Sequence, residues 1–468
     1  MSPEMEHSSF REQFETIIQT GDNKMLSEFL DDQNISDVAE LIYDDPEHEL
    51  AIISSMSVHR AASVFKILEL VNQKNIIKKL PPHKTAALLN ELPPDDRTDF
   101  LEELPSNVVR ELIKLLNTDE RKVALSLLGY PENSVGRLMT PDYVYVYEYN
   151  TVSEVLETIR RRGKDSETID VIYVINKIGE LMDDIRIREF LLAPPDTKVS
   201  DIMDGRYIAL NVFDDQEKAN EVFKMNNRVA LPVVSNSNKL LGIVTIDDIL
   251  WVAEEEFSED IQKIGGTAAL EAPYLDTPFF KLIQKRVGWL IILFLSELLT
   301  ATAMAYFNDE IAKATMLAMF IPLIMSSGGN SGSQASTLII QAMAVGEVHL
   351  SDWWRVMRRE ILSGLLLGTI LGLIGFVRIA LWHELMQHGV IRDLYGPNWL
   401  LVAFTVGVSL IGVVLWGTLS GSMLPIILKR LGADPAVSSA PFVATLVDVT
   451  GIVIYFSVAF LFLNGILL

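Results

Sequence analysis

The strongest constraint on the fold of this chain is a C-terminal half made of long apolar stretches. These cover approximately residues 287–307, 314–345, 361–382, 399–427 and 436–467. Each stretch is long enough for a helix to cross the ~30 Å hydrocarbon core of a bilayer. Because a chain in lipid must satisfy its backbone hydrogen bonds internally, the pattern predicts five membrane-spanning helices.

Basic residues flank these stretches unevenly. Eight Lys and Arg residues flank the ends of the stretches that would face one side of the membrane. Two, Lys313 and Arg392, flank the ends that would face the other side. Since the more basic ends usually stay in the cytoplasm, the N-terminal half is expected there and the C-terminus outside. Residues 1–21 have no apolar core, which argues against a signal peptide.

The half of the chain before the apolar stretches is strongly acidic. From Lys281 onward there are 11 basic and 10 acidic residues, whereas residues 1–280 contain 28 basic and 52 acidic ones, a net charge of −24. A field of this sign disfavours nucleic acid and favours cations as partners. The chain also has no cysteine, so disulfides and thiolate metal sites are excluded.

A period of twelve residues runs through part of the acidic half. A leucine-like residue recurs at Met56, Leu68, Leu80, Leu92, Leu104, Leu116 and Leu128. Pro81, Pro93 and Pro105 follow three of these positions, where proline favours the first turn of a new helix. The pattern predicts short helices stacked as a small solenoid. Its acidic residues are expected on solvated faces rather than at a metal site, including Asp95, Asp96, Asp99, Glu102 and Glu103.

Residues 138–250 contain two weakly similar halves, each of which reads strand, helix, strand, strand, helix. This pattern resembles a tandem CBS pair. The second half keeps Thr245 and Asp248 in the TxxD spacing that such domains often use on the ribose and phosphates of a nucleotide, whereas the first half has Arg186 and Glu189 there. The resemblance therefore implies an ATP site in one half at most, and a pair that binds no nucleotide is the alternative.

Residues 251–266 predict an acidic helix between this pair and the membrane. Its acidic residues are Glu254, Glu255, Glu256, Glu259 and Asp260. Like charges at these spacings destabilise a helix unless a cation or a basic partner compensates them. The stretch is therefore either a solvated connector or a lever or plug that responds to cations.

Asp448 lies well inside the last apolar stretch. A carboxylate near the bilayer centre costs ~2.5–3.5 kcal/mol on insertion scales, so it normally faces a pore, water or a partner. Ala440, Ala444 and Asp448 recur every four residues and so share one narrow helix face, with Gly451 nearby. This face predicts either an ion path or a hydrogen bond between helices.

The second stretch contains Pro322 and the run SSGGNSGSQ at 326–334, so a broken helix is expected there. Discontinuous helices offer carbonyls and amides to ions where they line a cavity. Asn330 supplies a polar side chain at this point. Of two further charges in the stretches, Arg378 is expected to reach the outer boundary, whereas Glu297 fits a cavity or a packing role.

Oxygen ligands without cysteine suit a hard cation, and residue types alone leave Mg²⁺, Ca²⁺ and Mn²⁺ open. The order of acidic repeat, CBS pair, acidic helix and five stretches, with the motifs GGNSGSQ and DPAVSSAPFVATLVDVTG, resembles the MgtE family of magnesium channels. The resemblance implies a multidomain fold. Its expected parts are an all-α helical-repeat domain at 1–132, an α/β tandem CBS pair at 133–250, a connecting helix and linker at 251–280, and a five-helix transmembrane domain at 281–468.

The resemblance also implies a homodimer in a bacterial-type plasma membrane, in contact with lipid, that takes up Mg²⁺ and is closed by cytoplasmic Mg²⁺. Asp448 would coordinate the hydrated ion, with the Ala444 carbonyl and Asn330 nearby. Asp434 would mark the cytoplasmic mouth of the pore. The regulatory Mg²⁺ would be held by Glu256, Glu259 and Asp260 on the connecting helix, and by Asp248.

Two other functions fit the sequence. One is a Mn²⁺, Co²⁺ or Zn²⁺ transporter of the same architecture, and the other is a membrane-anchored sensor whose CBS pair reads a nucleotide. A pure anchor needs neither Asp448 nor the GGNSGSQ run, which favours transport. An enzyme is disfavoured because no nucleophile–base arrangement or phosphate-cradling glycine loop is present.

Overall fold

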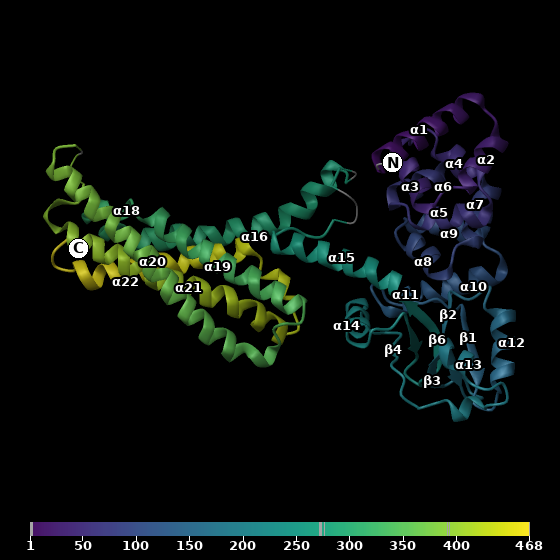
Figure 1. The fold of residues 1–468 in the computed structure, drawn as a ribbon. Coiled ribbons are helices and arrows are strands. Elements are labelled where there is room, and N and C mark those ends of the chain that lie inside the picture. The colour runs from purple at the N-terminus through teal and green to yellow at the C-terminus, as the bar shows by residue number, and fades with distance from the viewer. Residues whose placement is uncertain (1–2, 271–273, 276, 391, 393, 468) are drawn as a thin grey trace. The chain divides into compact units, whose positions relative to one another are not determined.

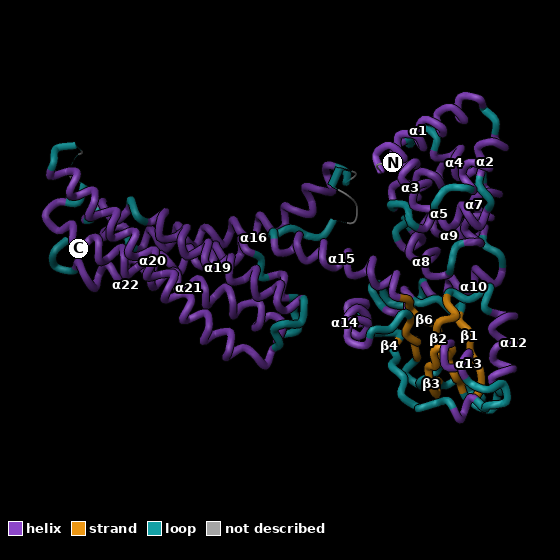
Figure 2. The backbone as a smooth tube through the Cα atoms, in the orientation of Figure 1, coloured by secondary structure: helices purple, strands orange, loops and turns teal. Residues whose placement is uncertain are grey.

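The computed structural model describes residues 3–270, 274–275, 277–390, 392 and 394–467. The chain divides into two compact units, Met1–Glu256 and Phe257–Leu468, each described here by itself. Figures 1 and 2 show helices throughout both units, with strands confined to part of the first unit. Part of the linker expected after the acidic helix, residues 271–273 and 276, lies outside the described residues.

The first unit begins with stacked short helices, as the twelve-residue period predicts. They are α1 (Pro3–Thr20), α2 (Asn23–Asp31), α3 (Ile35–Asp44), α4 (Glu49–Ser55), α5 (Val58–Lys66), α6 (Leu70–Lys79), α7 (Pro82–Glu91), α8 (Pro94–Glu102), α9 (Ser106–Leu115) and α10 (Thr118–Leu127). From α5 to α10 each helix starts twelve residues after the previous one. The recurring Met56, Leu68, Leu80, Leu92 and Leu116 are buried in one continuous core. The solenoid is therefore confirmed.

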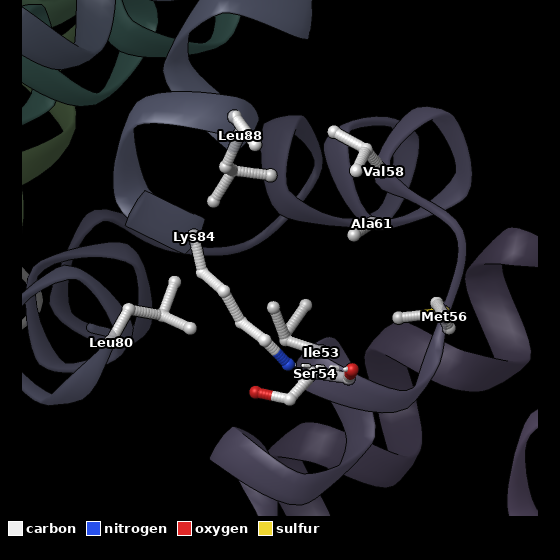
Figure 3. Close-up of a pocket in the computed structure, with 9 residues that line it drawn as sticks. Ile53, Ser54, Met56, Val58, Ala61, Leu80, Lys84 and Leu88 are labelled. Carbon is white, nitrogen blue, oxygen red and sulfur yellow. Dashed lines mark hydrogen bonds between the residues drawn. The ribbon is translucent and has the colours of Figure 1, made fainter. Parts of the chain in front are cut away.

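A small hollow lies among α4, α5 and α7 of this stack (Figure 3). Its lining is apolar apart from Ser54 and Lys84, and the Lys84 ammonium donates a hydrogen bond to the Ser54 carbonyl oxygen at 3.0 Å. The Lys84 ammonium is thus satisfied by a backbone carbonyl, as expected of a gap between stacked helices.

Two three-stranded sheets follow the stack, one in each half of the CBS pair. The first half contains α11 (Val135–Leu138), β1 (Tyr143–Tyr147), α12 (Val152–Arg162), β2 (Thr168–Ile175), β3 (Leu181–Arg186) and α13 (Ile187–Leu192). The second contains β4 (Leu210–Asn211), α14 (Gln216–Asn226), β5 (Ala230–Val234), β6 (Leu240–Thr245) and α15 (Ile246–Ile264). In each sheet the first two strands are parallel and the last two antiparallel. Tyr173 and Ile243 belong to one apolar cluster that joins the two sheets.

The second unit consists of long apolar helices joined by short ones. The long ones are α16 (Phe279–Tyr306), α19 (Ile321–Ala344), α20 (Trp353–Gln387), α21 (Trp399–Arg430) and α22 (Ala440–Leu463); the short ones are α17 (Asn308–Lys313) and α18 (Thr315–Ala318). Among the described residues, four of the long helices have the length and apolarity of a membrane span, and α19 falls short of that standard. The five helices predicted from the sequence are all present, four of them as candidate spans.

The prediction of a break within the run at 326–334 is wrong, because α19 is continuous from Ile321 to Ala344 and Pro322 lies at its start. The glycines serve helix packing instead. A Cβ at Gly421 of α21 would collide with the carbonyl oxygen of Gly332, and one at Gly417 would collide with that of Gly328. Small residues let membrane helices approach backbone to backbone in this way. The interruption of the second stretch lies earlier, between α18 and α19.

Candidate functional site

Asp448 lies on α22 where this helix meets α19. The buried Val443 and Val447 of α22 pack over Gly332 and Gly328. Between them, a Cβ built on Gly329 would lie 3.4 Å from the Ala444 Cβ and 3.8 Å from Asp448 Oδ1. Asp448 itself is only half-buried in the single chain. The glycines of α19 therefore allow a carboxylate in the membrane-spanning helix to approach α19 closely while part of it stays accessible.

The structure brings three of the expected pore residues to this contact. Asn330 follows Gly329 on α19 and is exposed, with its amide 3.4 Å from Ser326 Oγ. Ala444 lies one turn before Asp448 on the same face of α22. The adjacent stripe of α22 is packed, since Val443 and Val447 are buried. A half-open polar strip thus runs along the junction of α19 and α22.

Asp434 does not join these residues and lies in the loop before α22. Its Oδ1 accepts the backbone N–H of Ala436 at 2.8 Å. Its Oδ2 pairs at 2.7 Å with the ammonium of Lys263, which also pairs with Glu259. Burial opposes the charge of Lys263, but the hydrogen bonds to Asp434 and Glu259 prevail and raise the pKa of the ammonium above its usual range. The end of the acidic helix is therefore held at the loop that enters α22.

The same loop is attached to α19 by two hydroxyl groups. Ser336 Oγ donates to the Ser438 carbonyl oxygen at 2.8 Å, and Ser333 Oγ donates to that of Ala440 at 3.0 Å. Because Ser438 lies four residues from Asp434, these bonds connect the ion pair at Lys263 to the helix that carries Asn330.

A second group of carboxylates forms inside the first unit. We call it the acidic junction, and it comprises Asp95, Asp96, Glu167, Asp247 and Asp248. These residues come from α8, from the segment before β2 and from the start of α15, and their charges act on one another. Lys66 offsets part of the charge through an ion pair with Asp96 at 3.2 Å. Asp95 is only 6% exposed, and its Oδ1 has no hydrogen-bond partner among the described residues.

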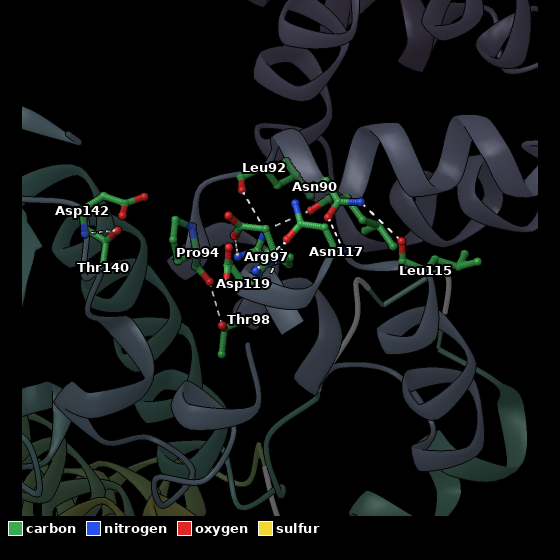
Figure 4. A network of polar contacts seen from close by, with 12 residues as sticks. Asn90, Leu92, Pro94, Arg97, Thr98, Leu115, Asn117, Asp119, Thr140 and Asp142 are labelled. Atoms are coloured by element: carbon green, nitrogen blue, oxygen red, sulfur yellow. Dashed lines mark hydrogen bonds and ion pairs between the residues drawn. The ribbon is translucent and has the colours of Figure 1, made fainter. Parts of the chain in front are cut away.

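The position of α8 in this junction depends on a buried arginine (Figure 4). Arg97 is completely buried, donates to the carbonyl oxygens of Leu89 and Leu92 at 3.2 and 3.4 Å, and pairs with Glu120 of α10. Truncating one partner of such a pair leaves a buried charge uncompensated, at a cost of about 3–5 kcal/mol. The neighbouring Asp95 and Asp96 are therefore fixed in place by the fold of the repeat.

This packing raises the pKa of the junction carboxyls. Burial, followed by the charge of Asp248, raises the pKa of Asp95 well above its ordinary value. Burial also raises the pKa of Asp248 to about 7, although a hydrogen bond from Thr245 acts in the opposite direction. Carboxyls that are crowded and desolvated in this way must either take up protons or bind a cation. The expectation that Asp95 lies on a solvated face is wrong.

The proposed nucleotide residues make contacts within the protein. The Thr245 hydroxyl donates to Asp248 Oδ2 at 2.6 Å. In the first half, Asp183 accepts three backbone N–H groups, and Asp184 pairs with Arg228 at 3.0 Å. Thr245 and Asp248 therefore remain a nucleotide candidate, but Asp248 is shared with the acidic junction.

The three acidic residues expected on the connecting helix do lie on α15. Glu256 accepts a hydrogen bond from Gln216 Nε2 at 2.9 Å, so it touches the second CBS half. Glu259 pairs with Lys263, and Asp260 is the next residue. Within the described residues, no three His, Cys, Asp or Glu side chains are grouped closely enough to hold a metal on their own. Any bound cation here would keep water or carbonyl oxygens among its ligands, as Mg²⁺ commonly does.

Sequence reasoning missed Lys263, Arg97 and Glu167. Lys263 and Asp434 are 171 residues apart, and Glu167 reaches the junction from between two strands. The pair Asp95-Asp96, directly after Pro93-Pro94 at a helix start, was the available local signal for the junction.

Comparison with known proteins agrees with this organisation. Family models match at residues 12–133 (MgtE intracellular N domain), at 135–196 and 199–255 (CBS domain), and at 321–458 (divalent cation transporter). A crystal structure of the soluble part of a magnesium transporter is 26% identical and covers 53% of this chain and 99% of that chain, with a TM-score of 0.50.

Two curated relatives extend the likeness across both units. The magnesium transporter MgtE of Thermus thermophilus is 38% identical over 357 residues, 76% of each chain. That of Enterococcus faecalis is 31% identical over 469 residues, 98% of this chain and 99% of the relative. The relatives are transporters, which confirms that the chain is not an enzyme. On these likenesses and the shared order of domains, the chain belongs to the MgtE family of magnesium transporters.

Proposed function

We propose that this chain works as a homodimer in the plasma membrane and forms a Mg²⁺-selective channel or transporter for magnesium uptake, closed by cytoplasmic Mg²⁺. The observation that carries the proposal is the half-buried Asp448 against Gly329, in a helix that is otherwise apolar. The uneven basic flanks support a cytoplasmic N-terminus and an external C-terminus.

At this point a hydrated Mg²⁺ would be held by charge and by oxygen dipoles. Asp448 supplies the carboxylate, while Asn330 and the Ala444 carbonyl supply neutral oxygens. Because Mg²⁺ gives up water reluctantly, a site with few protein ligands suits it when its hydration shell is kept. In a homodimer, two copies of these ligands would face each other across the twofold axis of the dimer.

Closure would use the acidic junction and α15. The crowded Asp95 and Asp248 favour a state in which a divalent cation neutralises them. Because α15 begins at the junction and ends at the Lys263–Asp434 pair, binding at its start can bias the position of its end. Glu256, Glu259 and Asp260 would share in this binding. ATP at Thr245 and Asp248 would compete with the cation for Asp248.

Uptake by the purified protein in liposomes tests the pore assignment. Asp448→Ala should abolish Mg²⁺ uptake, whereas Asp448→Asn should keep part of the binding but lose selectivity over monovalent cations. Asp309→Ala, which removes an exposed acid of α17, is the matched control and should transport normally. Wild-type uptake by Asp448→Ala would refute the assignment.

The same assay separates the rival ions. Mn²⁺, Co²⁺ and Zn²⁺ bind imidazole and thiolate more strongly than Mg²⁺ does, and the strip at α19 and α22 offers only oxygen. Mg²⁺ uptake should therefore persist in the presence of equal Mn²⁺ or Co²⁺. If either ion enters in preference to Mg²⁺, the chain is a transition-metal transporter of the same architecture.

A further inference from the structure

Glu297 is a second acidic residue in the membrane-spanning part, and the pore described above does not use it. It lies near the middle of α16, within a candidate span. In the single chain its side chain is exposed. A charged group exposed at this depth is costly in lipid and normally faces water, a cavity or a partner.

The helix contacts place Glu297 at the depth of Asp448. Phe307, at the end of α16, stacks on Phe456 of α22 with ring centroids 4.8 Å apart. Counting back along each helix, Glu297 lies ten residues and Asp448 eight residues before this pair, or ~15 and ~12 Å at 1.5 Å per residue. The two helices run in the same direction, because the segment Gly266–Ala268 touches both Pro441 and Lys285 near their starts.

Glu297 lies at the edge of the face of α16 that packs against α22, ~60° around the helix from Thr300. Thr300, one turn later, is the buried residue of this helix, and Ala303 and Phe307 continue the same stripe into the core that contains Phe456. The Thr300 hydroxyl is buried and makes no hydrogen bond within the described residues.

Two carboxylates at one depth in a membrane repel each other unless a cation or water lies between them. We propose that Glu297 lines the same ion path as Asp448 and sets its preference for divalent over monovalent cations. This inference rests on the proposed role of Asp448. Glu297 acts through its field, as a specificity-determining residue, while Asp448 remains the ion's carboxylate ligand.

The size of the effect follows from the charge of the ion. The attraction between a carboxylate and an ion is proportional to the ion's charge. If removing the carboxylate lowers the binding constant of a monovalent ion by some factor, it therefore lowers that of a divalent ion by the square of this factor. At several ångströms in a wet site the monovalent factor is about threefold, which makes the divalent factor about tenfold. Neutralising Glu297 should therefore lower Mg²⁺ preference over Na⁺ by about threefold.

The test uses the full chain in liposomes and measures Mg²⁺ and Na⁺ flux. Glu297→Gln should raise the half-saturating Mg²⁺ concentration about tenfold and lower the Mg²⁺/Na⁺ flux ratio, whereas Glu297→Asp should keep both near the wild type. Glu310→Gln, outside the long helices, is the control. If Glu297→Gln does not fold, Glu297→Asp against Glu297→Asn makes the same comparison at equal length.

The outcomes separate this inference from the pore assignment. If Glu297→Gln matches the wild type while Asp448→Ala is inactive, Glu297 is a packing residue and the inference is wrong. If Mg²⁺ and Na⁺ fluxes fall equally, Glu297 acts on structure rather than on ion choice, which also refutes it. If Asp448→Ala transports normally, the pore assignment itself is wrong.

Discussion

Neutralising one carboxyl of the acidic junction should stabilise the Mg²⁺-free soluble unit. Burial raises the pKa of Asp248 from 3.8 to about 7, so ionising this carboxyl costs about 4 kcal/mol more in the folded state than in the unfolded state. At pH 8 the folded unit carries this cost. Asp248→Asn removes the charge and keeps an oxygen that can accept the hydrogen bond from Thr245. We expect the unfolding free energy to rise by up to about 4 kcal/mol, or the melting temperature by roughly 10 °C.

The pH dependence has a definite sign. Between about pH 4 and pH 7 the folded state binds a proton at Asp248 that the unfolded state has released, so stability increases as the pH falls through this window. In the Asp248→Asn variant, the slope of the unfolding free energy against pH should be smaller in this window, by an amount that corresponds to about one bound proton. Mg²⁺ should stabilise the wild type by about 2.7 kcal/mol at a hundredfold excess over its dissociation constant, and the variant by less.

Thermal and urea unfolding of the fragment 1–265, at pH 5 and pH 8, with Mg²⁺ or with NaCl of equal ionic strength, checks this. A soluble part of this kind was crystallised for a related magnesium transporter. Asp196→Asn, at an exposed position in the CBS pair, is the control and should change neither slope nor Mg²⁺ response. A Mg²⁺-free Asp248→Asn fragment that is less stable than the wild type at pH 8 would refute the electrostatic reasoning.

Two further predictions concern α15. Replacing Glu256, Glu259 and Asp260 by Ala should let the channel conduct at cytoplasmic Mg²⁺ concentrations that close the wild type, with unchanged selectivity. Patch recordings across a Mg²⁺ series check this. If the variant closes at the wild-type concentration, the helix is only a linker. Lys263→Met should remove a partly exposed ion pair worth about 0.5–1 kcal/mol. The Mg²⁺ concentration that closes the channel should therefore rise about two- to fivefold, whereas Lys263→Arg should leave it unchanged. A Met variant that closes at the wild-type concentration would contradict a role for the pair in closure.

Features with a local sequence period were predictable. The twelve-residue repeat places one helix in each unit of the period, so the solenoid follows from the spacing of Leu68, Leu80 and Leu92. Asp448 was equally visible, because a carboxylate in an apolar run has few explanations. Both inferences depend on neighbours within a few turns of the same segment.

Features made by distant segments were not predictable in this way. Asp95 and Asp248 are brought together only by the packing of α8 against the CBS pair; the Asp95-Asp96 pair marks a helix start, but nothing nearby in the sequence indicates that Asp248 is its partner. The glycines of α19 were misread because the same residues that break a helix in isolation also permit close helix packing. Which role applies depends on α21, whose Gly417 and Gly421 lie opposite.

The continuity of α15 constrains how the chain can change in length. Asp248 and Lys263 are fifteen residues apart on one helix, which corresponds to ~22 Å of rise and an azimuth difference of ~60°. Deleting a single residue between them would turn Lys263 by ~100° around the helix axis relative to Asp248, although both side chains would be retained. Insertions of seven residues, close to two full turns, would nearly restore the angle. In this segment the number of residues between Asp248 and Lys263, which sets their relative angle on the helix, therefore matters as much as the identity of the residues.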